Sequence, residues 1–137
     1  ACTLVFSTPQ ANPCVSTLMS VALKHAGLPM ADPFQPGSLF SLGKPGLIDD
    51  LFRRAGFADI ATTAISAPFV LGSAADYLGF IRASASPVVS ILGRLDPAGR
   101  ERAWAEIETA LGRFAGEDGW TGPNELLLSC GTRPASE

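Results

Sequence analysis

The sequence predicts an α/β fold, and three observations lead to that prediction. Short apolar runs of strand character lie near both ends, at residues 2–7 and 125–132. Amphipathic helical patterns lie between them. Within "FRRAGFADIATTAI", residues 52–65, a helical pattern also passes directly into a strand. Helices and strands in this order are typical of helices packed on the face of a sheet.

The first half of the chain predicts a strand, a helix and a long loop. "CTLVFS" indicates a buried strand at residues 2–7. Asn12 is a favourable N-cap and Pro13 suits the first position of the helix, which Gly27 then ends. Residues 27–46 hold four prolines and four glycines but also several large apolar side chains. We therefore expect an ordered loop packed on the body of the protein.

A second helix is predicted to start at Pro45. Asp49–Arg53 and Asp50–Arg54 are expected as ion pairs on its exposed face. Its buried face is expected to comprise Leu47, Ile48, Leu51, Phe52 and Ala55. Gly56 is predicted to close a Schellman cap, and Phe57 to pack back on the helix. The strand "ADIATTAIS", residues 58–66, follows at once.

The second half predicts three helices, a turn region and a last strand. Ser73 with Asp76 resembles a capping box for a helix at 74–84. Further helices are predicted to begin at Pro87 and, with Asp96 as the cap, at Pro97, and the last of them is expected to include Phe114. Residues 116–124 are expected as turns, and residues 125–132 as the final strand.

Composition excludes several classes of function. A net charge of −3 and an isoelectric point near 5.1 argue against nucleic-acid binding. No apolar run approaches the roughly 20 residues of a membrane span. Only 17% of residues are charged, against about 25% in typical soluble domains. Part of the surface is therefore expected to be covered by a partner or by more of the same protein.

The residues most often used in catalysis form no constellation in the sequence. Cys2, Cys14 and Cys130 match no metal-ligand spacing and are expected to be buried free thiols in a reducing compartment. Cys14 lies near a helix N-terminus, which favours a thiolate, but it has no histidine or aspartate near it in the sequence. His25 is expected to complement the C-terminal end of the first helix.

Several segments resemble one family when taken together. "FSLGKPGLIDDLFRRAGFADI" is similar to the helix and sixth strand of class I S-adenosylmethionine-dependent methyltransferases. "TLVFSTPQANP" resembles their fifth strand and the loop after it. "DPAGRERAWAEIETALGRFAGEDGWTGPNELLLSCGTRP" resembles the insertion helix and seventh strand of the small-molecule branch. The sequence departs from the family pattern at Lys44, because relatives commonly place an acidic capping residue before the proline at this point.

The resemblance implies a partial Rossmann-like methyltransferase fold in one domain, residues 1–137. It would hold the fifth, sixth and seventh strands of the family sheet, with the last strand antiparallel, and a helical insertion at 73–115. The glycine-rich loop and acidic residue that hold S-adenosylmethionine would precede Ala1. No cofactor-binding residue is therefore assigned, and this chain alone is expected neither to bind the cofactor nor to be active.

The resemblance also implies an acceptor site and partners. In this family the loop after the fifth strand and the insertion shape the acceptor pocket, and an apolar pocket suits a small apolar molecule. The matching residues are Thr8, Gln10, Asn12, Phe40, Tyr77, Phe80 and Ile81. Alternatively, the aromatic residues among them belong to the hydrophobic core and do not contact an acceptor. Expected partners are the acceptor and the N-terminal half or a second copy, in the cytoplasm. Two alternatives are a stand-alone ligand-binding module and a dimerisation module that pairs exposed strand edges.

Overall fold

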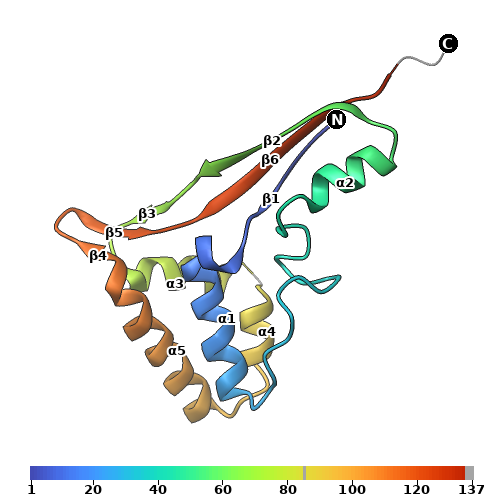
Figure 1. Cartoon of the computed structure of the whole chain (residues 1–137). Coiled ribbons are helices and arrows are strands. Elements are labelled where there is room, and N and C mark those ends of the chain that lie inside the picture. The colour runs from blue at the N-terminus through green and yellow to red at the C-terminus, as the bar shows by residue number, and fades with distance from the viewer. Residues whose placement is uncertain (85, 135–137) are drawn as a thin grey trace. The chain divides into compact units, whose positions relative to one another are not determined.

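The computed structural model describes residues 1–84 and 86–134 (Figure 1). The chain forms two compact units. The first comprises Ala1–Asn12, Ala31–Ala67 and the residues from Asn124 on, and the second comprises Pro13–Met30 and Pro68–Pro123. None of the helices in the described residues is long and apolar enough to cross a bilayer. The mixed α/β class predicted from the sequence is confirmed.

The first unit is built on a three-stranded sheet in the order β1-β6-β2. Its strands are β1 (Cys2–Phe6), β2 (Ala58–Ser66) and β6 (Glu125–Thr132), and β6 runs antiparallel to both neighbours. Cys2 lies opposite Cys130, and Phe6 lies opposite Leu126. The predicted strands at the two ends of the chain are thus adjacent and antiparallel. A short 3-10 helix, η1 (Pro9–Ala11), follows β1.

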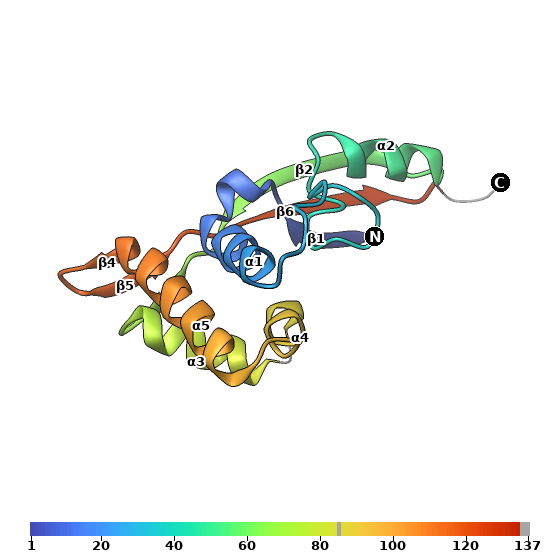
Figure 2. The same cartoon turned by 90° about the horizontal axis from the view of Figure 1, so that it is seen from below.

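Helix α2 (Leu47–Arg54) lies beside this sheet and ends in the predicted hook (Figure 2). Gly56 has φ 80° and donates its N–H to Arg53 O at 3.0 Å. The N–H of Phe57 donates to Phe52 O at 3.0 Å. These two bonds are those of a Schellman cap, and the prediction is confirmed. At Gly131 of β6, a side chain would meet both Phe52 and Phe57, so the glycine lets the hook approach the sheet.

The start and the exposed face of α2 differ from the prediction. The helix begins at Leu47 and its N-cap is Gly46, with φ 78°, so Lys44 is not the capping residue. Arg53 pairs with Asp50 one turn away, at 2.7 Å, while Asp49 accepts a bond from the Thr62 hydroxyl of β2. Of the expected buried face, Leu51 and Ala55 are exposed. A helix on a sheet of three strands has only a narrow surface to cover.

The second unit packs four helices: α1 (Pro13–His25), α3 (Ala74–Ala83), α4 (Pro87–Leu92) and α5 (Pro97–Leu111). Ser73 caps α3 by accepting the N–H of Asp76 at 3.1 Å, and Asp96 caps α5 through Gly99, as predicted. The core is formed mainly by Cys14, Leu18, Val21, Ala22, Tyr77, Leu78, Val88, Leu92, Ala103, Trp104, Ile107, Leu111 and Trp120.

A small second sheet was missed by the sequence analysis. Strands β3 (Phe69–Leu71), β4 (Ala115–Gly116) and β5 (Gly119–Gly122) pair antiparallel in the order β3-β5-β4. Part of the predicted turn region, residues 116–124, is therefore strand, and Phe114 lies in the 3-10 helix η2 (Gly112–Phe114) rather than in α5. Strands of two to four residues are too short to show a period-2 pattern.

The cysteines also differ from the prediction. Cys2 and Cys130 form a disulfide between β1 and β6, and only Cys14 is a free, buried thiol. The strand register places the two cysteines directly opposite each other, with Cα atoms 4.1 Å apart. Residues 128 positions apart become neighbours only through sheet pairing, which cysteine spacing alone does not reveal.

Candidate functional site

The seven predicted site residues divide between the two units. Thr8, Gln10, Asn12 and Phe40 belong to the first unit; Tyr77, Phe80 and Ile81 belong to the second. The structure therefore defines two groups, one around the end of β1 and one around α3.

In the first unit, the side chain of Asn12 joins the end of β1 to the start of β6. It is fully buried. Its Oδ1 accepts the N–H of Glu125 at 2.8 Å, and its Nδ2 donates to Thr8 O at 2.9 Å and to Ser7 Oγ at 3.2 Å. These bonds occupy the amide at both ends, so its geometry is that of a structural clamp.

The other predicted residues of the first unit differ in accessibility. Phe40 is 5% exposed, and its ring lies edge-on to Phe6 with centroids 6.0 Å apart. Thr8 is half-buried and Gln10 is exposed. Among these four predicted residues, Thr8 and Gln10 are thus the two whose side chains are accessible to a ligand.

In the second unit, an open apolar hollow of about 280 Å³ lies between β3 and α3. It is lined by Pro68, Phe69, Val70, Leu71 and Phe80. Val70 is 70% exposed and Phe80 is 54% exposed, so two of the apolar side chains that line the hollow face solvent. Only Phe80 was predicted from the sequence. The run "PFVL" at 68–71 is apolar enough to have indicated the other residues.

Tyr77 lies behind this hollow. It is completely buried; its ring is 5.2 Å from that of Phe69 and is stacked on Trp120 at 4.9 Å. Among the described residues its hydroxyl has no hydrogen-bond partner. Burial, with a smaller effect from Cys14, raises the pKa of Tyr77, so the phenol stays protonated. Its hydroxyl lies in the core and does not line the hollow. Ile81, 9% exposed, is part of the core.

Cys14 is also in this core, in the first turn of α1. A helix N-terminus favours a thiolate, but burial raises the pKa of Cys14 to about 11, and the nearby Arg113 lowers it only in part. Desolvation therefore outweighs the charge of Arg113, and the thiol is neutral. A side chain at Gly122 would contact both Cys14 Sγ and Trp120, which leaves no space for a substrate beside the sulfur.

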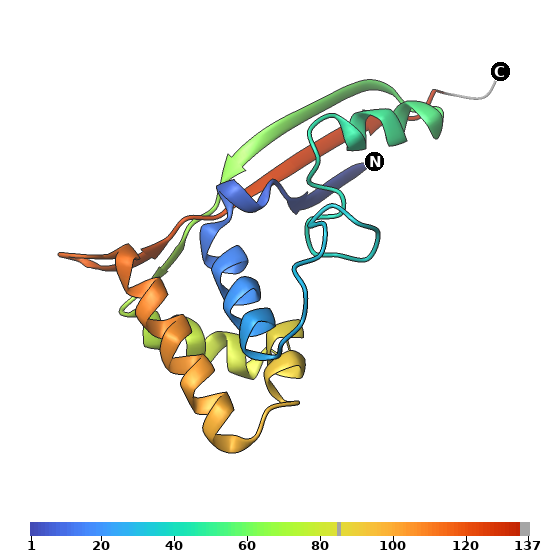
Figure 3. The same cartoon turned by 60° about the horizontal axis from the view of Figure 1, so that its bottom comes forward.

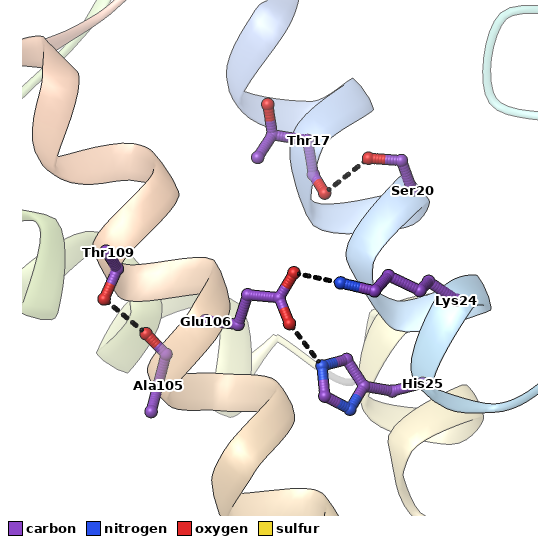
Figure 4. Close-up of polar contacts among 7 residues, drawn as sticks. All are labelled: Thr17, Ser20, Lys24, His25, Ala105, Glu106 and Thr109. Atoms are coloured by element: carbon purple, nitrogen blue, oxygen red, sulfur yellow. Dashed lines mark hydrogen bonds and ion pairs between the residues drawn. The ribbon is translucent and has the colours of Figure 1, made fainter.

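The single histidine belongs to an ion cluster on the surface (Figure 4). His25 Nε2 lies 2.7 Å from one carboxylate oxygen of Glu106, and Lys24 Nζ lies 2.7 Å from the other. The pKa of Glu106 is lowered mainly by the hydrogen bond from Lys24 and, to a smaller extent, by the hydrogen bond from His25. The cluster ties the end of α1 to α5. The partner of His25 is not evident from the sequence, because Glu106 is 81 residues away.

A second hollow of about 400 Å³ lies between α3 and α5. It is open and is lined by small or polar residues: Ser73, Ala74, Ala75, Ala105, Glu108, Thr109 and Gly112. Glu108 is its one carboxylate, so the hollow offers no acid–base pair. In the part of the chain that the structure describes, no three histidine, cysteine or acidic side chains gather as metal ligands would. The apolar hollow beside Tyr77 is therefore the candidate site.

Comparison with known proteins gives no assignment. No protein-family model matches the sequence, and no curated protein matches it.

Proposed function

We propose that this chain is the acceptor-side, C-terminal portion of a class I S-adenosylmethionine-dependent methyltransferase that acts on a small apolar molecule. The strand order carries the proposal. β6 lies between β1 and β2 and is antiparallel to both, which is the arrangement that the resemblance implies for the fifth, seventh and sixth family strands. The Schellman hook that leads into β2 agrees with the same assignment.

The acceptor class follows from the apolar hollow. Its lining contains no charged side chain, so it favours an apolar molecule over an ionic one. Tyr77 adds a buried, neutral hydroxyl behind Phe69, without a partner among the described residues. We propose that Phe69, Val70 and Phe80 contact the acceptor, and that Tyr77, which is fully buried and does not line the hollow, supports the ring of Phe69.

The role of this chain in the reaction is to position the acceptor and exclude water. When bound by the N-terminal half, S-adenosylmethionine would supply an electrophilic methyl group for a nucleophilic atom of the acceptor. No described residue is assigned to that cofactor. The N-terminal half is proposed to hold it and to be the partner that completes the sheet, and without that half the chain is proposed to be inactive.

Three measurements test the proposal. Titration of this chain with S-adenosylmethionine in a calorimeter should give no heat, and stoichiometric binding would contradict the assignment. The mass of the native polypeptide should exceed that of this chain, and its preceding sequence should contain a glycine-rich loop after a strand. In that polypeptide, Val70→Glu should reduce methyl transfer to an apolar acceptor, whereas Val70→Leu should not.

A stand-alone binding module remains the alternative. It would bind an uncharged apolar probe, such as the dye N-phenyl-1-naphthylamine, in the hollow without the cofactor or an N-terminal half. Val70→Glu would then abolish dye binding by this chain alone. The same dye experiment on the longer polypeptide shows whether the N-terminal half changes access to the hollow.

A cytoplasmic location belongs to the same proposal. The Cys2–Cys130 disulfide weighs against it, because disulfides persist mainly in oxidising compartments. Trapping of thiols with an alkylating reagent in freshly lysed cells distinguishes the two: three modified cysteines support the cytoplasm, and one supports an oxidising compartment.

A further inference from the structure

The outer edge of β2 has the properties of a strand that pairs with another chain. β2 is bonded to β6 on one side and, among the described residues, to no second strand. Residues 61–66 are all exposed, and residues 60–66 contain neither a charge nor a proline. Edge strands are usually protected by such residues or by bulges. β2 has this protection only at its start, where Asp59 has φ 51° and the register shifts between Ala58 and Ala61.

The opposite edge of the sheet is different. Gly43, in the long loop, lies directly against the carbonyl groups of Phe6 and Ser7, at the end of β1. A side chain at Gly43 would clash with both carbonyls. Figure 3 shows β2 as the outermost strand on the other side of β6. The long loop therefore contacts the β1 edge at Phe6 and Ser7, whereas among the described residues no backbone hydrogen bond engages the outer side of Thr62 or Ala64 in β2.

The pairing with β6 decides which amides of β2 point outward. Ala67 donates its N–H to Asn124 O at 2.9 Å, and Ala61 to Ser66 continue the same register, with Ala61 opposite Cys130. In an antiparallel ladder, hydrogen-bonded and non-bonded pairs alternate. Ala61, Thr63 and Ile65 therefore bond to β6, as Ala67 does. The N–H and C=O groups of Thr62 and Ala64 point away from the sheet.

We propose that this edge pairs antiparallel with β2 of a second copy of the chain, about a two-fold axis beside Thr63. In this register Thr63 lies opposite Thr63 of the second copy. Thr62 lies opposite Ala64, so each outward-pointing amide meets another. Ala61 lies opposite Ile65, and Ile60 lies opposite Ser66. Two sheets of three strands become one continuous sheet of six.

A second copy fits this edge because the strand is its own complement. A two-fold axis perpendicular to the sheet places each face of one copy on the same side as the same face of the other copy. Because the numbers of two paired residues add to an even total, a residue whose N–H and C=O point outward is always paired with another such residue. No charged pair is formed between residues 60 and 66. The edge also offers no charge with which to select a foreign peptide. This inference does not depend on the proposed enzymatic activity.

Analytical ultracentrifugation of this chain over a range of concentrations tests the pairing. We expect a monomer–dimer equilibrium. Ala64→Pro removes an outward N–H without removing a bond to β6. Two interchain bonds are lost in the dimer, so its dissociation constant should rise about thirtyfold or more. Circular dichroism and thermal melting establish that the variant remains folded.

A charge pair at the axis gives a second test. Thr63→Lys and Thr63→Glu should each weaken self-association, since like charges then face each other across the axis. An equimolar mixture of the two variants should restore the dimer. Gln35→Lys and Gln35→Glu, in the exposed loop of the same unit, serve as matched controls and should leave self-association unchanged.

Hydrogen exchange identifies the strand directly. On dilution, exchange at Thr62 and Ala64 should become faster, while Thr63 and Ile65 stay protected by β6. A monomer at every concentration would overturn the proposal. So would a dimer that is unaffected by Ala64→Pro and by both Thr63 variants, because its interface would then lie elsewhere.

Discussion

Phe52 and Phe57 are joined twice at the end of α2, by a backbone hydrogen bond of 3.0 Å and by rings whose centroids lie 5.2 Å apart. Gly56 stands between them with φ 80°, a conformation that costs other residues about 1 kcal/mol or more. This glycine therefore allows the helix to turn directly into β2.

Replacement of Gly56 tests the hook. Gly56→Ala should lower the free energy of unfolding by about 1 kcal/mol, measured by urea denaturation. Gly56→Asn should lose less, because asparagine tolerates the left-handed conformation. Gly112→Ala is the control: Gly112 has φ −57° and open space around its Cα, so stability should barely change. Equal losses of unfolding free energy for Gly56→Ala and Gly112→Ala would contradict the Schellman cap at Gly56.

Asn12 should be essential for the stability of the first unit. Asn12→Ala leaves buried partners unsatisfied, including the N–H of Glu125, and should cost about 2–3 kcal/mol. Asn12→Asp keeps the acceptor but places a buried carboxylate oxygen against Thr8 O, so near neutral pH it should cost at least as much as Asn12→Ala. Gln10→Ala, on an exposed residue of η1, should have little effect. Wild-type stability for Asn12→Ala would contradict the clamp.

The hydroxyl of Tyr77 should be dispensable for folding. It is buried without a partner among the described residues, so Tyr77→Phe should leave the unfolding free energy unchanged or raise it by about 1 kcal/mol. Trp120→Phe is the contrast, since it loses the buried bond from Nε1 to Leu111 O. A clear loss of stability in Tyr77→Phe would mean that the hydroxyl is bonded.

Glu106 should make stability depend on pH. Its pKa is lowered in the folded chain by Lys24 and His25, so the stabilisation is present above the ordinary carboxyl pKa and disappears as pH falls through the lowered value. Glu106→Gln should therefore be less stable than wild type near neutral pH and equal to it in acid. Glu108→Gln, on the exposed surface of the same helix, should show no such difference. Identical pH profiles for Glu106→Gln and wild type would contradict the ion cluster.

The disulfide predicts a thiol count and a loss of stability on reduction. The denatured, unreduced chain should react with one equivalent of a thiol reagent, at Cys14, and with three after reduction. Because the bridge closes a loop of over a hundred residues, reduction should cost about 2–4 kcal/mol. The double variant Cys2→Ser and Cys130→Ser should not respond to reductant. Three reactive thiols without reduction would show that the bridge is absent.

Local chemistry was sufficient to predict much of the fold. The Gly56–Phe57 hook, the caps at Ser73 and Asp96 and the terminal strands depend on a few neighbouring residues, and each was found where expected. The candidate site was predicted less completely. Phe80 was named from its place on a helix, but Phe69, Val70 and Leu71 form a strand too short to show a periodic pattern.

The sequence by itself determined the α/β class, the main helices and the terminal strands, because helix periodicity, caps and apolar runs act within a few residues. Only the tertiary structure decided which distant residues meet. It placed Cys130 opposite Cys2, Glu106 beside His25 and Tyr77 against Trp120. Each of these contacts depends on strand register or helix packing, in which residues far apart along the chain contribute together.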